Sequence, residues 1–165
     1  MLRVDIRDLQ RGPVKTVGDL QPDDPAFAGL DLDLVGPVSV TGQLQATGSG
    51  EYLWRGRFRG VFNTECRRCL AEFETDLDIN VEAAIFSTDP DAADDPDSYP
   101  LLERATHIDI RDVAREELAL SVPFRLLLCR EDCAGLCVDC GADLNAGPCA
   151  CSAPAEPVRG SNGSS

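Results

Sequence analysis

The chain of 165 residues has little basic charge, few aromatic residues and a single histidine. It carries 15 Lys and Arg against 29 Asp and Glu, which gives a formal net charge of −14. Non-specific nucleic-acid binding depends on Lys and Arg displacing phosphate counterions, so the surface as a whole is unsuited to it. A local basic patch, or a basic protein partner, remains compatible with this charge, and composition alone favours a protein partner.

Long apolar runs are absent as well. No stretch of about 18 apolar residues occurs, so we expect no transmembrane helix and no membrane partner. The N-terminal residues 1–8 alternate charged with apolar side chains, which is unlike the apolar centre of a secretory signal. We therefore expect a cytoplasmic protein whose thiols stay reduced.

Motifs of common enzymes are missing too. The sequence contains no Gly-rich phosphate loop, no Gly-x-Ser-x-Gly elbow and no His-Glu-x-x-His pair. Its one histidine, His107, stands alone, and a lone histidine is more often structural than catalytic. We expect no enzymatic activity and no small-molecule substrate.

Cysteine is the residue type that stands out by its abundance and placement. Close pairs at C-x2-C and similar spacings are typical of structural zinc, which takes four ligands in a tetrahedral shell. Eight thiolates would complete two shells, so we predict one or two Zn²⁺ ions. Disulfides, after loss of an export signal, or a redox dithiol are the alternatives. The four pairs are Cys66/Cys69, Cys129/Cys133, Cys137/Cys140 and Cys149/Cys151.

Spacing also suggests which cysteines share an ion. The third pair lies between Gly135 and Gly141, and the fourth pair is its nearest downstream neighbour, so we group these two pairs. The first two pairs then form a second group, in which a strand hairpin anchors the start of the C-terminal segment. One occupied group with a free dithiol, or a crossed grouping, fits the same spacing.

Alternating apolar and polar residues predict two long strands in the middle of the chain. Residues 52–62 carry apolar side chains mainly at even positions, and residues 71–85 carry them mainly at odd positions. A hairpin that turns at residues 67–68 pairs residues whose numbers sum to 135. This one register pairs apolar with apolar side chains and Arg57 with Asp78.

The tip of this hairpin carries two arginines that we expect to bind a partner. Arg57 and Arg59 have acidic residues opposite them in the predicted register, so ion pairing accounts for them. Arg67 and Arg68 have no predicted partner and are expected at the exposed turn.

The remaining elements complete an α+β fold. Residues 38–46 predict a third strand, with Val40 near Phe58 and Leu44 near Trp54. Residues 87–100 contain five Asp and three Pro and are expected to form a mobile acidic loop.

A helix begins after Asp109 as N-cap, is bounded by Pro123, and should cover the apolar face of the sheet. We predict a mainly antiparallel meander, or partly closed sheet, with one covering helix over residues 1–128. A small zinc-bound module follows at 129–151, and then a disordered tail at 152–165.

Two segments together resemble the YceD family of bacterial and plastid proteins. The first is Glu65-Cys66-Arg67-Arg68-Cys69-Leu70, followed by an acidic strand. The second runs from Val122-Pro123 through the cysteines of residues 129–140 and Gly141-Ala142-Asp143-Leu144-Asn145 to Cys149-Ala150-Cys151. The chain departs from the family pattern at Val138, where Pro is usual, and after Cys151, where many members continue with a short apolar helix.

The resemblance implies a role in 23S ribosomal RNA accumulation or assembly of the large ribosomal subunit, without enzymatic activity. Its expected partners are ribosomal RNA or large-subunit ribosomal and assembly proteins. The alternative is a zinc-dependent protein–protein adaptor unconnected to ribosomes.

Overall fold

The computed structural model describes residues 1–124 and 127–152, and the chain divides into two units. Unit one comprises Met1–Thr64 and Glu74–Arg125, and unit two comprises Glu65–Phe73 and Leu126–Ser165. The hairpin tip with its two cysteines therefore belongs to the same unit as the six C-terminal cysteines. The tail predicted at 152–165 lies outside the described residues apart from Ser152.

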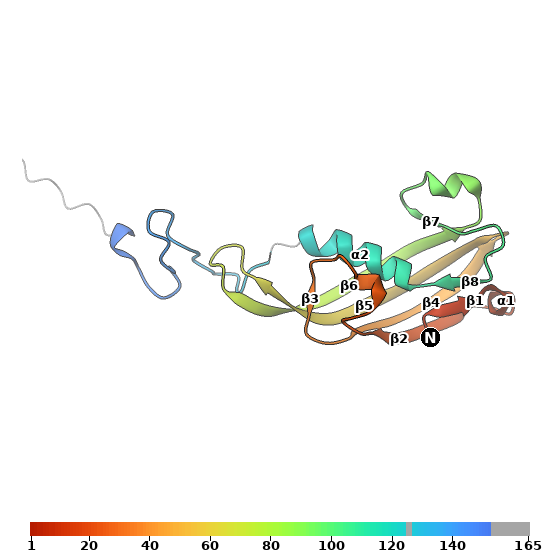
Figure 1. Ribbon diagram of the computed structural model, residues 1–165, viewed down its shortest axis with the longest axis horizontal. Helices are drawn as coiled ribbons and strands as arrows, with labels where there is room; N and C mark the ends of the chain where they lie inside the picture. The colour runs from red at the N-terminus through yellow and green to blue at the C-terminus, as the bar shows by residue number, and fades with distance from the viewer. Residues whose placement is uncertain (125–126, 153–165) are drawn as a thin grey trace, which may run out of the picture. The chain divides into compact units, whose positions relative to one another are not determined.

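The fold consists mostly of β-strands with few helices (Figure 1). A six-stranded open sheet has the strand order β2-β4-β5-β6-β7 with β3 beside β5, while β1 and β8 pair separately. All the pairings given for the described strands are antiparallel except β6 with β7, so the sheet is mainly antiparallel, and open rather than partly closed. The elements are β1 (Arg3–Asp5), α1 (Ile6–Leu9), β2 (Val14–Leu20), η1 (Pro25–Phe27), β3 (Asp33–Leu34), β4 (Val38–Gly48), β5 (Glu51–Glu65), β6 (Glu72–Ser87), η2 (Pro90–Ala93), β7 (Ser98–Pro100), β8 (His107–Asp109), α2 (Arg111–Phe124) and η3 (Ala150–Ser152).

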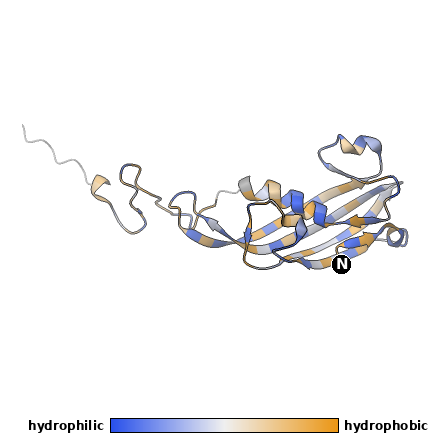
Figure 2. Ribbon diagram, viewed as in Figure 1, coloured by the Kyte–Doolittle hydropathy of each residue, from blue (hydrophilic) through white to orange (hydrophobic). Residues whose placement is uncertain are grey.

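The pairing of β4 with β5 confirms the predicted register of the third strand. Val40 lies opposite Phe58 and Leu44 lies opposite Trp54, and all four side chains are fully buried. Figure 2 shows hydrophobic and hydrophilic residues alternating along these strands, as expected when one face of a sheet is buried. Between β5 and β6, Arg57 forms the predicted ion pair with Asp78.

The indole of Trp54 explains two glycines in the sheet. A Cβ atom on Gly56 would lie 2.3 Å from Cζ2 of Trp54, and one on Gly42 would lie 2.7 Å from the same ring. The ring nitrogen donates to Oγ1 of the buried Thr16 at 2.8 Å, which satisfies the only polar atom of the indole. The glycines thus make room for the largest side chain of the core.

Residues 87–100 are more structured than their composition indicates, and the prediction of a mobile acidic loop was wrong. The Asp89 carboxylate accepts the N–H of Asp91 and caps η2, whose Ala92 is buried. β7 then pairs in parallel with β6, and the Tyr99 ring packs against Phe86 with centroids 5.1 Å apart. Aspartates that cap local turns give this acidic segment its structure.

Helix α2 begins as predicted, because the Asp109 carboxylate accepts the backbone N–H of Arg111 at 3.0 Å. It runs to Phe124 and buries an apolar face that includes Val113, Ala114 and Leu118. That this face covers the sheet stays a prediction. Among the described residues, no helix has the length and apolar character that crossing a membrane requires.

Candidate metal centres

The hairpin tip differs from the predicted two-residue turn. Cys66 donates its backbone N–H to the carbonyl of Ala71 at 2.9 Å, and Leu70 donates to the carbonyl of Cys66 at 2.9 Å. The prediction that Cys66 lies opposite Cys69 was therefore wrong, because the turn is wider. Leu70 adopts a left-handed backbone with φ of 62°, which lets the chain close this turn after Cys69.

Backbone hydrogen bonds join the tip to the C-terminal segment. The N–H of Arg67 donates to the carbonyl of Leu127 at 3.0 Å, and the carbonyl of Arg68 accepts the N–H of Leu136 at 3.2 Å. The Arg68 guanidinium also donates to the carbonyl of Cys133 at 3.1 Å. The expectation that Arg68 has no partner within the chain was wrong, although both arginine side chains are exposed as expected.

Four thiols meet at this junction and form what we call the hairpin cluster. Their sulfur atoms all lie within 4.8 Å of one another. Two of the separations, Cys66 to Cys133 and Cys69 to Cys129, are 3.7 Å. Zinc bound tetrahedrally at about 2.3 Å from each sulfur places neighbouring sulfurs about 3.8 Å apart, so the thiols fit such an ion. The cluster consists of Cys66, Cys69, Cys129 and Cys133.

The hairpin cluster is closed to solvent on most sides. Cys66 is 0 %, Cys133 2 % and Cys69 9 % exposed, and Phe73 and Leu128 are among the partly buried residues packed against them. A site whose four positions are all filled by thiolates leaves no place for substrate, which is typical of structural metal sites. The arrangement therefore suits a cross-link better than a reaction centre.

A second group, the terminal cluster, also has its four sulfurs within 4.8 Å of one another. Cys137 is buried, whereas Cys140 and Cys151 are exposed. The turn after Cys137 closes through its N–H to Ala142 O at 2.8 Å and through Gly141 N–H to Cys137 O at 2.9 Å. The cluster consists of Cys137, Cys140, Cys149 and Cys151.

The eight cysteines thus come together in the same two groups of four that the spacing suggested. Either group could hold a metal ion. That each group holds one ion, and that the ion is zinc, stays a prediction.

The hairpin cluster perturbs the pKa values of its thiols in opposite directions. Burial acts to raise the pKa of Cys66, but backbone N–H groups of Cys129, Cys69 and Arg68 outweigh it and lower this pKa to about 6. Burial, with the neighbouring thiols, raises the pKa of Cys129 to about 12. For Cys69, the N–H of Ala71 favours the thiolate, yet burial and neighbouring thiols together raise its pKa. The thiolate of Cys66 is thus favoured, whereas Cys69 and Cys129 are held in the protonated form and must lose protons to become ligands.

Binding of zinc at pH 7 is therefore expected to release protons, because Cys69 and Cys129 must ionise to become ligands. Cys66, with its pKa of about 6, is mostly ionised at pH 7, so its thiol contributes to the proton release on zinc binding mainly at lower pH. Loss of the Cys69 and Cys129 protons alone makes the zinc affinity rise roughly 100-fold per pH unit near pH 7, and any further thiol that ionises on binding makes the rise steeper. Calorimetry in two buffers of different ionisation enthalpy counts the protons, and binding without release would contradict the expectation.

Sequence reasoning missed one residue beside the clusters, Asn145. Its Nδ2 lies 3.4 Å from Sγ of Cys133, while its Oδ1 accepts the N–H of Ala134 at 2.8 Å. Only its place in a Gly- and Asp-rich turn could have indicated a structural role, and that signal does not identify a sulfur as its partner.

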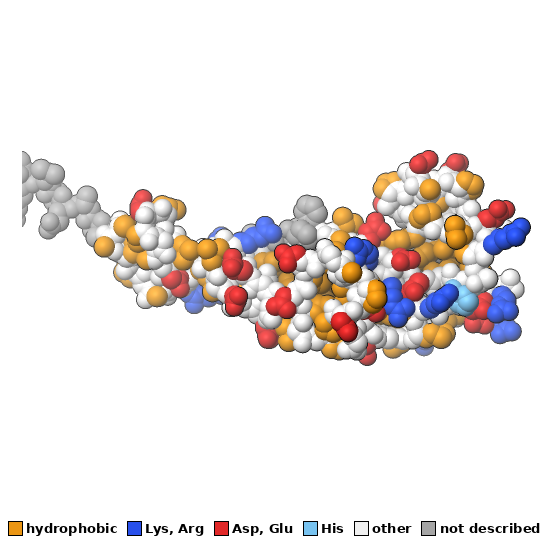
Figure 3. All heavy atoms as spheres, in the orientation of Figure 1, with side chains coloured by type: hydrophobic (Ala, Val, Ile, Leu, Met, Phe, Trp, Pro, Cys, Tyr) orange, Lys and Arg blue, Asp and Glu red, His pale blue; other side chains and the backbone are white. Residues whose placement is uncertain are grey.

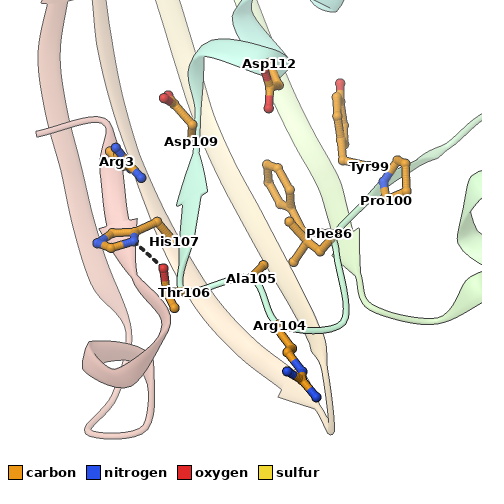
Figure 4. A pocket seen from close by; sticks show the side chains of 11 residues that line it. Arg3, Phe86, Tyr99, Pro100, Arg104, Ala105, Thr106, His107, Asp109 and Asp112 are labelled. Atoms are coloured by element: carbon orange, nitrogen blue, oxygen red, sulfur yellow. Dashed lines mark hydrogen bonds between the residues drawn. The ribbon is translucent and has the colours of Figure 1, made fainter.

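Unit one has a pocket of about 650 Å³ that contains the single histidine (Figure 4). Its walls include the aromatic residues Phe86 and Tyr99 and, around them, Arg3, Arg104 and Asp112. His107 contacts the hydroxyl of Thr106 through Nδ1 at 2.8 Å. Figure 3 shows acidic and basic side chains interspersed over this region, so its surface charge favours neither an anionic nor a cationic ligand.

The family model described as Large ribosomal RNA subunit accumulation protein YceD matches residues 54–159, which is well over half of the chain and includes all eight cysteines. The chain belongs to the YceD family. The resemblance drawn from the cysteine segments is confirmed. No curated protein and no solved structure matches the chain.

The YceD description links the family to accumulation of large-subunit ribosomal RNA and names no catalytic activity. Val138, where the resemblance implied Pro, is 97 % exposed. Its side chain therefore makes few contacts within the terminal cluster, and the departure leaves the thiol grouping intact.

Proposed function

We propose that this YceD-family protein is a non-enzymatic, cytoplasmic factor in biogenesis of the large ribosomal subunit that supports 23S ribosomal RNA accumulation. The observation that carries the proposal is the family match over residues 54–159, because it spans both cysteine clusters. We propose further that each cluster holds one Zn²⁺ ion and that residues 129–151 act as a zinc-bound module.

A bound zinc would supply a cross-link between chain segments that are distant in sequence. In the hairpin cluster the segments are the β5–β6 tip and residues 127–133, which lie side by side through the hydrogen bond from Arg67 to Leu127. The chain's own residues orient the thiols, and backbone N–H groups stabilise the thiolate of Cys66. This cross-link would hold the exposed hairpin tip, with Arg67 and Arg68, at a fixed place within unit two.

The partner proposed first is ribosomal RNA or a large-subunit protein that contacts the hairpin tip. The net charge of −14 disfavours RNA contact over the surface as a whole, so contact must be local. Basic ribosomal proteins are attracted by the same charge.

Reversal of the charge at Arg67 is expected to weaken association with large-subunit precursors about tenfold or more, because a hydrogen bond to a charged group contributes about 1.5–3 kcal/mol. Arg68→Glu is measured beside it, and zinc content and melting temperature are recorded for both variants, because the guanidinium of Arg68 also donates to the carbonyl of Cys133. Sedimentation of lysate on a sucrose gradient measures the association. Arg55→Glu, an exposed position on β5, is the matched control.

Unchanged co-sedimentation of Arg67→Glu, with unchanged zinc content and melting temperature, would contradict a role for this arginine. The alternative function, a zinc-dependent adaptor unconnected to ribosomes, is favoured by the acidic charge. Capture from lysate before and after RNase treatment separates the two functions, since an adaptor would keep a non-ribosomal protein partner after digestion.

A further inference from the structure

The side chain of Asn145 connects the two cysteine clusters. It belongs to the loop between Cys140 and Cys149 of the terminal cluster, yet its Nδ2 donates to Sγ of Cys133 in the hairpin cluster at 3.4 Å. No other hydrogen bond given for the described residues runs from a side chain in this loop to a thiol of the hairpin cluster.

The orientation of this amide is fixed by its other partners. Oδ1 accepts the backbone N–H of Ala134 at 2.8 Å and Nη2 of Arg130 at 2.7 Å. An amide turned over would direct its N–H₂ group at these two donors, so Nδ2 must face the sulfur. The Asp143 carboxylate accepts both the backbone N–H and Nδ2 of Asn145 at 2.9 Å, which holds the residue in place.

A short backbone ladder adds stiffness between the clusters. Leu136 and Asp143 form an antiparallel bridge, and the N–H of Leu144 donates to the carbonyl of Gly135 at 2.9 Å. Cys133 and Cys137 are separated by only the three residues 134–136 of this ladder. The two clusters are therefore joined by a short, hydrogen-bonded stretch of chain.

We propose that Asn145 couples the two clusters, so that metal bound in one raises the affinity of the other. A thiolate accepts an N–H bond more strongly than a neutral thiol does. Ligation of Cys133 as a thiolate would strengthen its bond from Asn145 and order the loop that leads to Cys149. By thermodynamic linkage, order imposed on this loop by metal in the terminal cluster favours the hairpin cluster equally.

This inference rests on the proposed zinc binding, and it can be tested separately by native mass spectrometry. Metal-free full-length protein is titrated with less Zn²⁺ than would fill both clusters, and the forms with zero, one and two ions are counted. Coupled clusters give less of the one-ion form than independent clusters of the same affinities would, and Asn145→Ala is expected to raise the share of that form. Independent filling in the unchanged protein would overturn the coupling.

A second variant separates the donor group of Asn145 from its acceptor oxygen. Asn145→Asp keeps an oxygen for Ala134 and Arg130 but removes both donations from Nδ2, to Cys133 and to Asp143. It should populate the one-ion form as Asn145→Ala does. Asn63→Ala, which removes an exposed amide bonded to Asp33 in unit one, is the control and should behave like the unchanged protein.

A competing chelator then measures the coupling itself. Cys140→Ser disables the terminal cluster and is expected to lower the zinc affinity of the hairpin cluster about tenfold, within the usual range for linked sites. In the Asn145→Asp background the same serine should change that affinity little. An equal fall in both backgrounds overturns the role of Asn145, whereas absence of any zinc binding overturns the proposed metal centres instead.

Discussion

Metal removal by a strong chelator is expected to unfold residues 65–73 and 127–152 and to leave the sheet of unit one folded. Among the described residues of unit two, the buried apolar side chains are all cysteines, and the apolar side chains packed against the hairpin cluster, among them Phe73, Leu128 and Leu136, are only partly buried. Binding of structural zinc contributes about 10–16 kcal/mol in small zinc-binding peptides. Such a contribution equals or exceeds the whole stability of many domains, which is about 5–15 kcal/mol.

Hydrogen exchange measured by mass spectrometry resolves this effect along the chain. Amides that hold the clusters together, such as those of Cys66, Leu136 and Cys137, should lose protection after chelation. Amides of β4 and β5 around Val40 and Trp54 should keep theirs, because that core is built from fully buried apolar side chains. Addition of zinc should restore the first group, and protection that is equal with and without chelator would contradict the expectation.

Loss of one buried ligand is expected to be far more damaging than loss of one exposed ligand. Cys133 is 2 % exposed, lies 3.7 Å from the sulfur of Cys66 and receives the N–H of Asn145. Cys133→Ser should therefore abolish metal binding at the hairpin cluster and weaken the terminal cluster as well. Cys140 is exposed, so Cys140→Ser should leave the hairpin cluster occupied.

Zinc content and thermal unfolding of the two serine variants distinguish these outcomes. Cys133→Ser should lose the unfolding transition of unit two, whereas Cys140→Ser should keep it at a lower temperature. The two substitutions remove the same atom type, so they are matched controls for each other. If the two variants lose equal amounts of zinc and thermal stability, or if Cys140→Ser loses more, then burial of the thiols does not determine which cluster contributes more to stability.

The regular part of the sheet could be predicted from sequence because side-chain alternation fixes which residues face the core. Parity places Val40 and Phe58 on the same face, and the turn after Gly48 brings them opposite each other. Parity likewise places Arg57 and Asp78, which form an ion pair, on the outer face. The grouping of the cysteines could also be inferred, since short spacing keeps two thiols of each pair on one turn.

The turns could not be predicted in the same way. The width of the hairpin tip depends on a left-handed Leu70, a conformation that sequence rarely signals for leucine. The structure of residues 87–100 depends on individual aspartates that cap turns, and these cannot be recognised from the acidic composition of the segment. The contact between Asn145 and Cys133 joins residues from separate turns, so no local pattern contains it.

Zinc counted per chain in protein purified without chelator and without added metal tests whether these thiols are ligands. About two zinc ions per chain are expected, because eight thiolates fill two tetrahedral shells. A chain that carries no metal, yet shows residues 65–73 and 127–152 fully protected from exchange, would contradict the metal centres.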